Sequence, residues 1–326
     1  MKSIDVLMPA PMPPLVTKGV DAAFRVHKIW EAPDPGARLN EIAPSIRAIV
    51  AGGGHQPIDA GFMAKFPKLE IISSLGVGYD HVDAKWAGAH GITVTHTPDV
   101  LNEEVADTAI GLLLCTVRRF PQADRYVRAG KWLEKPFPLT ATLRGRTMGI
   151  LGLGRIGKAI ARRGEALGLK IAYHGRSRQA DVAYPYFADL TDMAKAVDIL
   201  MIIAPGGAAT NRIVNAEVLK ALGPDGVLIN VARGSVVDED ALIAALRDKT
   251  ILTAGLDVFA DEPRVPQALI DMDHITLFPH LGSASHHTRD AMSQLVVDNL
   301  IQWAAGKGPL TPVPETPWRA GAGRGA

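Results

Sequence analysis

Short runs of aliphatic and β-branched residues alternate with amphipathic stretches along most of the chain. Such runs, bounded by Gly, Pro, Asn or Asp, predict strands, and apolar positions at helical spacing between them predict helices. Strands that alternate with helices in this order are typical of parallel sheets covered by helices on both faces. The pattern therefore predicts an α/β fold rather than a β-sandwich or a helix bundle.

The predicted strands fall into two groups. Those of the first third lie near residues 4–8, 47–51, 70–74 and 93–95, and those of the second group near residues 147–151, 170–174, 199–204, 227–231, 251–256 and 274–278. The second group suits a doubly wound, dinucleotide-binding sheet. A helix is predicted from about Asn102 to Ala129 between the groups, and another from about His286 to Ala305 after them. The Pro- and Gly-rich residues 306–326 are expected to lack regular structure and to be mobile.

Length and charge narrow the classes of function. A chain of 326 residues exceeds what one hydrophobic core usually organises, so two domains are expected. Lys and Arg total 35 and Asp and Glu total 34, a net charge of +1 without a concentrated basic block, which argues against a nucleic-acid partner. Apolar runs such as 199–204 are far shorter than the roughly 20 residues of a membrane span, so no membrane partner is expected.

Further features bear on location and on chemistry. The N-terminal residues lack the pattern of a signal peptide, so a cytoplasmic location is expected. Cys115 is the only cysteine and lies in an apolar run, which favours buried packing over a reactive thiol. His286 and His287 are adjacent, so their side chains would point about 100° apart on a helix, and no metal site is predicted.

A Gly-x-Gly-x-x-Gly motif follows the predicted strand at 147–151 and opens a helical stretch. Glycine is common in this chain, with 32 residues, so the strand and helix on either side give the motif its weight. Gly152 would permit the tight turn, Gly154 the close approach of a pyrophosphate, and Gly157 the packing of the helix on the sheet. The N-terminus of that helix would offer N–H donors and a positive dipole to the anion. The predicted cofactor turn comprises Gly152, Gly154, Arg155, Ile156 and Gly157.

The end of the next predicted strand indicates which dinucleotide binds. An Asp or Glu about 20 residues after the glycine motif normally holds the ribose 2′-hydroxyl of NAD. Here Gly175 stands at the corresponding place and is followed by Arg176, Ser177 and Arg178. Guanidinium groups bind a 2′-phosphate, which a carboxylate would repel. The sequence therefore favours NADP(H) over NAD(H), with a solvated basic loop as the alternative interpretation of the arginines.

Arg233, Glu262 and His280 each follow a different predicted strand of the second group. The carboxyl ends of parallel strands meet at one edge of a sheet, where ligands of doubly wound folds bind. A guanidinium can bind a substrate carboxylate, and an imidazole whose protonated form a carboxylate stabilises can act as a general acid. Taken singly, the three are equally consistent with a surface ion pair, a turn carboxylate and a buried histidine. Taken together with the residues that flank them, they are harder to explain as three unrelated features.

Four segments carry a resemblance to a known family: Leu-Gly-Leu-Gly-Arg-Ile-Gly at 151–157, Asn-Val-Ala-Arg-Gly at 230–234, Asp-Glu-Pro at 261–263 and Pro-His-Leu-Gly-Ser-Ala-Ser at 279–285. Through them the chain resembles the D-2-hydroxyacid dehydrogenase family over roughly residues 70–305. Within that family it is most similar to the NADPH-dependent glyoxylate/hydroxypyruvate reductases.

The resemblance implies two doubly wound parallel-sheet domains, with a Rossmann cofactor domain inserted in a smaller, flavodoxin-like substrate domain. The implied limits are 1–99 and 285–326 for the substrate-binding domain and 100–284 for the NADP-binding domain. The implied activity is the NADPH-dependent reduction of a small 2-keto acid, such as glyoxylate or hydroxypyruvate, to the D-2-hydroxy acid. The family also implies a homodimer, formed through the region around residues 100–145.

The resemblance also implies roles for single residues. Arg233 would bind the substrate carboxylate and carbonyl, His280 would donate the proton and Glu262 would orient His280. The further cofactor contacts that it implies are Val231, Ala232 and Asp257, the last to the nicotinamide amide. The substrate contacts that it implies are Leu75, Gly76, Val77, Gly78, Arg233 and Ser283.

Two other functions stay open at this stage. One is an NAD-dependent 2-hydroxyacid dehydrogenase of amino-acid biosynthesis, which would bind NADH better than NADPH. The other is a dinucleotide-sensing interaction protein without catalysis, since the same family fold also serves as a redox-responsive corepressor scaffold and fold alone does not decide function. The presence of Arg233, Glu262 and His280 favours an enzyme.

Overall fold

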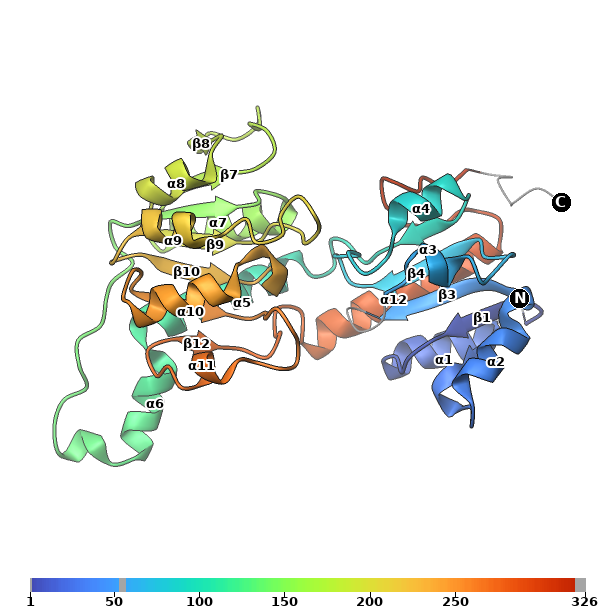
Figure 1. The fold of residues 1–326 in the computed structure, drawn as a ribbon, viewed down its shortest axis with the longest axis horizontal. Coiled ribbons are helices and arrows are strands. Elements are labelled where there is room, and N and C mark those ends of the chain that lie inside the picture. The colour runs from blue at the N-terminus through green and yellow to red at the C-terminus, as the bar shows by residue number, and fades with distance from the viewer. Residues whose placement is uncertain (1, 53–56, 320–326) are drawn as a thin grey trace. The chain divides into compact units, whose positions relative to one another are not determined.

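A computed structural model describes residues 2–52 and 57–319 of the protein. The chain divides into two compact units: unit 1 comprises Met1–Leu101 and His286–Ala326, and unit 2 comprises Asn102–Ser285. Each unit contains one sheet in which every pair of neighbouring strands is parallel (Figure 1). The predicted α/β class with two parallel-sheet domains is confirmed.

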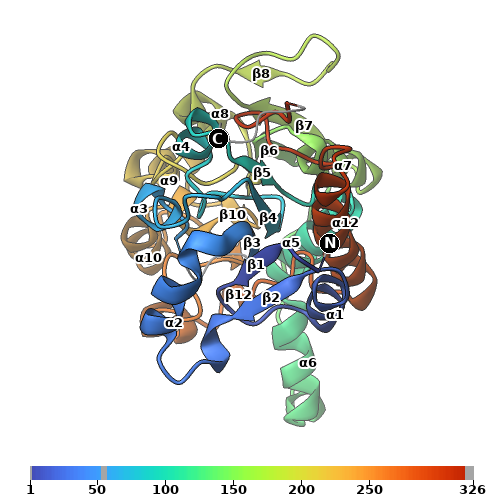
Figure 2. The ribbon, with the colours of Figure 1, turned by 90° about the vertical axis from the view of Figure 1, so that its right-hand side faces the viewer.

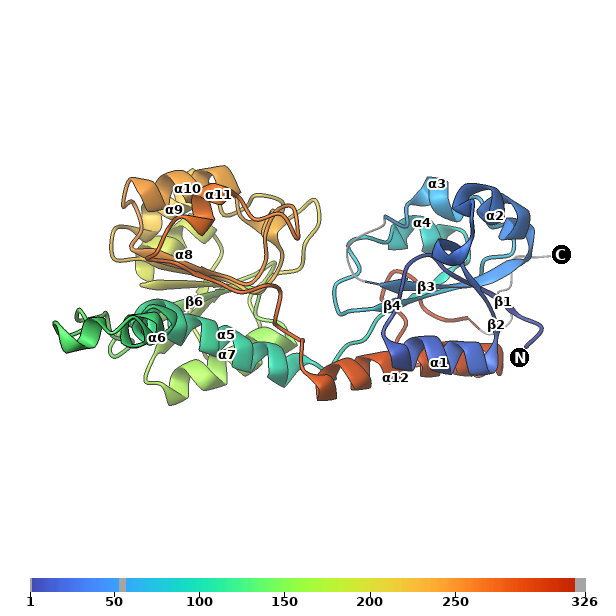
Figure 3. The same cartoon turned by 90° about the horizontal axis from the view of Figure 1, so that it is seen from below.

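Unit 1 is built on a five-stranded sheet of order β2-β1-β3-β4-β5. Its strands are β1 (Asp5–Met8), β2 (Arg25–Lys28), β3 (Ile46–Gly52), β4 (Ile71–Leu75) and β5 (Thr93–Thr95). Figure 3 shows α1 (Pro14–Ala23) and α12 (His286–Ala304) on one face, with α2 (Pro35–Ile42), α3 (Ala60–Met63) and α4 (Ala84–Ala89) on the other. The helices α1 and α12 pack side by side in Figure 2, so the returning C-terminal helix completes a domain that the first hundred residues begin.

The strand β2 was not predicted from the sequence. Its four residues, Arg-Val-His-Lys, form an edge strand and are half-buried or exposed. An edge strand with one partner does not need the uninterrupted apolar run by which buried parallel strands are identified. The polar composition of β2 is therefore the reason why the hydrophobic pattern did not predict this strand.

Unit 2 is built on a seven-stranded sheet of order β12-β11-β10-β9-β6-β7-β8. Its strands are β6 (Thr147–Leu151), β7 (Lys170–His174), β8 (Tyr186–Phe187), β9 (Ile199–Ile202), β10 (Val227–Asn230), β11 (Thr253–Leu256) and β12 (Thr276–Leu277). In Figure 3, α5 (Asn102–Arg118) and α7 (Arg155–Ala166) cover one face, and α8 (Leu190–Ala196), α9 (Ala216–Leu222), α10 (Glu239–Arg247) and α11 (Gln267–Ile270) cover the other. The strand order reverses at β6, which lies between β7 and β9, and this switch point is where doubly wound sheets bind ligands.

The helix predicted over residues 102–129 is two helices. The first, α5, ends at Arg118, and α6 spans Phe120–Arg128. Between them, Arg119 adopts the left-handed conformation with φ of 53°, and Pro121 lies in the first turn of α6. A proline has no N–H for the hydrogen bond that would continue α5, so the break follows from Pro121.

The expectation of a mobile C-terminal tail is wrong for the residues that the structure describes. Val313 N donates to Val94 O at 2.9 Å, and the side chains of Val313 and Thr316 are 0% and 3% exposed. The segment thus pairs with β5, whose outer edge would otherwise leave backbone groups unpaired. Composition alone did not indicate this partner. Residues 320–326 of the predicted tail lie outside the described residues.

The glycine motif forms a close-packed turn between β6 and α7. Gly152 has φ of 101°, and a Cβ there would lie 2.8 Å from the backbone of Ala204. A Cβ on Gly157 would overlap the carbonyl oxygen of Gly152, so the first turn of α7 packs directly on the preceding loop. A Cβ on Gly154 would meet none of the described atoms within 4 Å. Two of the three glycines are therefore required by packing alone.

The difference in packing between Gly157 and Gly154 predicts that alanine substitutions at the two positions affect the stability of the protein differently. Gly157→Ala should lower the free energy of unfolding by about 1–3 kcal/mol, because overpacking forces the backbone apart. Gly154→Ala should change it by less than about 0.5 kcal/mol. Urea denaturation followed by circular dichroism measures both, and equal losses in the two variants would contradict the packing account.

Candidate active site

His280 and Glu262 form a hydrogen-bonded pair. His280 follows β12 and Glu262 lies in the loop after β11, so neighbouring strands deliver the two side chains to one edge of the sheet. The Nδ1 atom of His280 lies 2.7 Å from Oε2 of Glu262. A carboxylate only accepts, so Nδ1 carries the hydrogen and Nε2 is the ring nitrogen available for proton exchange. The His280 side chain is 46% exposed, which leaves the imidazole accessible to a ligand.

The pKa of Glu262 lies below its usual value. Burial raises this pKa, but the hydrogen bond and the charge of His280, together with the backbone N–H of Phe259, outweigh burial and lower it. The charge of Arg233 lowers the pKa further, so this guanidinium lies within electrostatic range of the carboxylate. The carboxylate therefore stays ionised at neutral pH and accepts the hydrogen bond from Nδ1 of His280.

Arg233 sits in a turn that the end of β10 fixes. Asn230 Nδ2 donates to Arg233 O at 3.0 Å, and Asn230 Oδ1 accepts from Ala232 N at 3.1 Å. A Cβ on Gly234 would overlap the carbonyl group of Phe259, so this turn packs directly on the loop that carries Glu262. The absence of a side chain at Gly234 is what brings the Arg233 and Glu262 loops together.

Asp257 follows β11 directly and is 1% exposed. Its Oδ1 accepts from Leu281 N at 2.6 Å and its Oδ2 from Gly282 N at 2.9 Å. The carboxylate thus lies beneath the loop of His280, a contact that the sequence did not indicate. Ser283 lies half-buried in the same loop.

The cofactor turn lies at the carboxyl end of β6, at the switch point of the sheet. The N-terminal turn of the twelve-residue helix α7 follows it. The first backbone N–H groups of this helix would therefore be available to a pyrophosphate bound at the turn. Arg155 is exposed and Ile156 half-buried at this turn, whereas Val231 and Ala232 after β10 are 6% and 5% exposed.

The loop after β7 holds the predicted phosphate-binding arginines. Arg176, Ser177 and Arg178 are all exposed. The next residue, Gln179, donates through Nε2 to Leu153 O at 2.7 Å and so ties this loop to the glycine turn. Asp181 forms an ion pair with Lys158 at 2.8 Å, so the charge of this nearby acid is compensated. The residues present fit a 2′-phosphorylated dinucleotide, and Gln179 is a connection that the motif did not reveal.

Leu75, Gly76, Val77 and Gly78 belong to unit 1, whereas the other predicted site residues belong to unit 2. Gly76 has φ of 144°, a conformation that favours glycine. Its N–H donates to Thr97 Oγ1 at 3.0 Å, and Val77 O lies 2.9 Å from Nδ1 of His96. Side chains that follow β5 therefore fix the shape of this loop, and the N–H of Gly76 is already used.

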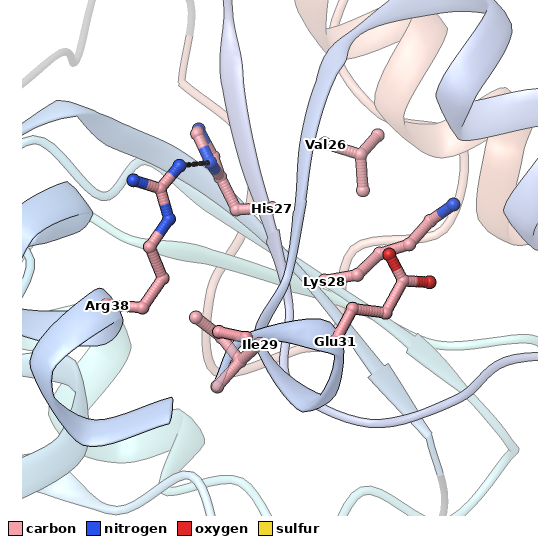
Figure 4. A pocket seen from close by; sticks show the side chains of 7 residues that line it. Val26, His27, Lys28, Ile29, Glu31 and Arg38 are labelled. Carbon is pink, nitrogen blue, oxygen red and sulfur yellow. Dashed lines mark hydrogen bonds between the residues drawn. The ribbon is translucent and has the colours of Figure 1, made fainter. Parts of the chain in front are cut away.

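A cavity of about 220 Å³ lies elsewhere in unit 1, beside the edge strand β2 (Figure 4). Its lining includes three basic side chains, and each has an acidic partner, at 2.7, 2.8 and 2.8 Å respectively: His27 with Asp5, Lys28 with Asp21 and Arg38 with Glu41. Arg38 also approaches Nδ1 of His27, as the dashed line in Figure 4 shows. The charges of Lys28 and Arg38 are compensated within unit 1, and the lining contains none of the predicted site residues.

Within residues 2–52 and 57–319, no helix combines the length and the apolar character that crossing a membrane requires. The same residues include no group of three or more His, Cys, Asp or Glu side chains arranged to hold a metal ion.

Comparison with known proteins gives consistent matches. Residues 110–282 match the D-isomer specific 2-hydroxyacid dehydrogenase, NAD binding domain. The glyoxylate/hydroxypyruvate reductase A of Arabidopsis thaliana is 45% identical, with 96% of this chain and 100% of the relative covered. A hydroxyphenylpyruvate reductase of Plectranthus scutellarioides is 44% identical over the same shares.

A solved structure agrees with these relatives. The NADPH-dependent glyoxylate/hydroxypyruvate reductase of Sinorhizobium meliloti, in complex with NADP and malonate, is 48% identical and has a TM-score of 0.90. The match covers 97% of this chain and 98% of that one. The chain therefore belongs to the D-isomer specific 2-hydroxyacid dehydrogenase family.

Proposed function

We propose that this protein is an NADPH-dependent reductase that converts a small 2-keto acid, such as glyoxylate or hydroxypyruvate, to the D-2-hydroxy acid. The observation that supports this most strongly is the pair of His280 Nδ1 and Glu262 Oε2 at 2.7 Å, with an accessible imidazole and the Arg233 charge in range. The names of the relatives in plants and in Sinorhizobium meliloti point to the same reaction and the same cofactor.

The proposed mechanism divides the work among three side chains. NADPH, when bound, supplies a hydride to the keto carbon. Arg233 binds the substrate carboxylate and stabilises the negative charge that grows on the carbonyl oxygen. His280 transfers the proton on Nε2 to that oxygen, and Glu262 stabilises the protonated imidazole before transfer. In the direction of oxidation, neutral His280 accepts the proton from the hydroxy acid.

The proposed cofactor site is the glycine turn with α7 and the loop after β7. The turn of Gly152, Gly154 and Gly157 would hold the pyrophosphate, with Arg155, Ile156, Val231 and Ala232 beside the cofactor and Asp257 near the nicotinamide. Arg176 and Arg178 would bind the 2′-phosphate through charge-assisted hydrogen bonds, with Ser177 between them. Two observations support NADPH. Arg176 and Arg178 are exposed and so accessible to a phosphate, and Lys158 compensates the negative charge of Asp181, which would otherwise repel one.

The proposed substrate contacts are the loop after β4 and Ser283. Leu75, Val77 and Gly78 would present the loop after β4 to the substrate, with N–H donors from Val77 and Gly78, and Ser283 would add a hydroxyl. Gly76 would serve this loop through its backbone conformation, because its own N–H donates to Thr97. In this proposal unit 1 is the substrate-binding domain and unit 2 the NADP-binding domain.

A homodimer through the region around residues 100–145 is proposed from exposed apolar side chains. Those within residues 120–139 of unit 2 are Phe120, Val127, Trp132, Leu133 and Leu139, which are between 48% and 101% exposed. Figure 2 shows that α6, which carries the first two, extends from the rest of unit 2. Concentrated apolar side chains of this kind mark interaction surfaces. The cytoplasmic location stays a prediction.

The direct test is NADPH oxidation with glyoxylate and with hydroxypyruvate. We expect turnover of both substrates, with kcat/KM higher for NADPH than for NADH. Arg176→Ala should lower kcat/KM for NADPH by about 10-fold or more, because a charged hydrogen bond contributes about 1.5–3 kcal/mol, and should change that for NADH much less. No turnover would favour the dinucleotide-sensing alternative, and a preference for NADH would favour the biosynthetic dehydrogenase.

The role of Glu262 predicts a shift in the pH profile of reduction. Because its pKa lies below the usual value, Glu262 is charged throughout the neutral range and stabilises the proton that His280 donates. The rate of reduction should therefore persist below the usual pKa of a glutamate and fall only where Glu262 gains a proton. Glu262→Gln has no charge to lose, so its rate should be lower at neutral pH and should lack this acidic fall.

A nearby carboxylate provides the matched control. Glu239 of α10 accepts through Oε2 from Ala260 N, in the loop that carries Glu262, at 3.1 Å, and among the described residues it forms no hydrogen bond or ion pair with His280. Glu239→Gln should leave the rate at neutral pH and the acidic fall in place, whereas His280→Ala should lower kcat by about 10²–10⁴-fold. Loss of the acidic fall in Glu239→Gln as well as in Glu262→Gln would refute the assigned role.

A further inference from the structure

His280 has a backbone conformation that its side chain disfavours. Its φ is 55°, in the left-handed region that residues other than glycine rarely adopt. Such a conformation costs of the order of 1–3 kcal/mol and persists only where the surroundings determine it strongly. The contacts that hold this backbone therefore also set the direction in which the imidazole leaves the chain.

Three successive N–H groups of the His280 loop donate to one residue. His280 N donates to Asp257 O at 2.9 Å, Leu281 N to Oδ1 at 2.6 Å and Gly282 N to Oδ2 at 2.9 Å. Asp257 is itself fixed, because its own N–H donates to Asn230 O at 2.9 Å. The hydrogen bond from Asp257 to Asn230 and those from the loop to Asp257 thus connect the ends of β10 and β11 to the backbone of His280.

The carboxylate of Asp257 is buried and is matched to this loop. Burial, together with the charge of Glu262, raises the pKa of this carboxyl group above its usual value, and the hydrogen bonds from Leu281 N and Gly282 N and the charge of His280 offset only part of that rise. Only the ionised carboxyl group accepts on both oxygens without a competing hydrogen. A Cβ on Gly282 would lie 3.3 Å from Oδ2, so the loop reaches the carboxylate closely because this position is glycine.

We propose that Asp257 is a positioning residue that holds the 280–282 loop, so that His280 keeps Nδ1 on Glu262 and presents Nε2 to the substrate. The role is additional to the nicotinamide contact that the family resemblance implies, and its effect on turnover depends on the proposed function. The two roles differ in what they control. Loss of a nicotinamide contact weakens cofactor binding, whereas loss of positioning slows turnover through His280 alone.

The test combines Asp257→Asn with a double-mutant comparison. Asp257→Asn keeps the size of the side chain but replaces one acceptor oxygen by an NH₂ donor. It should lower kcat for hydroxypyruvate at saturating NADPH by about 10- to 100-fold, beyond any change in the Kd of NADPH, because small misplacements of a reacting group cost this much. In the His280→Ala background, the same substitution should change kcat by less than about 3-fold, because both changes act on one group.

Asp198→Asn is the matched control. Asp198 Oδ2 accepts from Thr147 N at 2.8 Å at the opposite edge of the same sheet, so this variant also weakens a carboxylate bond to a backbone N–H. It should leave kcat within about 2-fold of the wild type. An Asp257→Asn effect that is undiminished in the His280→Ala background, or that lies in the Kd of NADPH alone, would overturn the proposal.

An NMR measurement on the enzyme without substrate tests the positioning role of Asp257 independently of the proposed function. The nitrogen-15 and proton resonances of the His280 Nδ1–H group should shift or broaden in Asp257→Asn and stay unchanged in Asp198→Asn. An unchanged His280 signal in Asp257→Asn would refute the positioning role whatever the activity. A shifted signal in a protein that reduces no 2-keto acid would support the positioning role and refute the proposed function.

A second variant applies if Asp257→Asn does not fold. Gly282→Ala would place a methyl group 3.3 Å from Oδ2 of Asp257 and displace the loop slightly. We expect a smaller loss of kcat, of about 3- to 10-fold, with the same shift of the His280 resonance. Normal kcat with an unchanged resonance in this variant would count against the proposal.

Discussion

The hydrogen bond between His280 and Glu262 is the interaction on which the proposed chemistry depends. It forms because β11 and β12 are neighbours in a parallel sheet and the loops that follow them leave at the same edge. The ionised carboxylate fixes the hydrogen on Nδ1 and so leaves Nε2 for proton transfer. The bond therefore sets the tautomer of the imidazole and the ring nitrogen that faces away from Glu262.

Close backbone contacts hold these loops in place. Gly234 lets the turn of Arg233 pack on the loop of Glu262, and Asp257 accepts three N–H groups from the loop of His280. The first connection joins backbone to backbone, and the second joins backbone N–H groups to the carbonyl and the short side chain of Asp257. This favours a rigid arrangement, because it loses little side-chain entropy when the loops come together.

Much of the fold could be predicted from the sequence. Helices cover both faces of a parallel sheet, so its central strands are apolar on both sides and can be recognised as apolar runs. Strands such as β9 and β10 are buried over their whole length and read as uninterrupted apolar runs. The edge strands β2 and β8 could not be predicted, since β2 is polar and β8 has two residues. The pairing of Val313 with β5 was equally hidden, because it depends on a segment more than two hundred residues away.

The sequence also indicated which residues to expect in the site, but not how they are held. Arg233, Glu262 and His280 stand out because each follows a predicted strand within a recognisable motif. The left-handed φ of His280 and the hydrogen bond from Gln179 to Leu153 depend on the folded backbone, and no local pattern encodes them. Motifs thus identify the reacting groups, while their orientation comes from tertiary contacts.

A crystal structure with NADP and oxalate, a substrate-like dicarboxylate that cannot be reduced, tests the central claim most directly. The account predicts that Nε2 of His280 lies about 2.7–3.2 Å from an oxalate oxygen, with Nδ1 still on Glu262 and the Arg233 guanidinium on the carboxylate. An oxalate bound away from this imidazole, or a His280 ring that turns Nδ1 to the ligand, would contradict it.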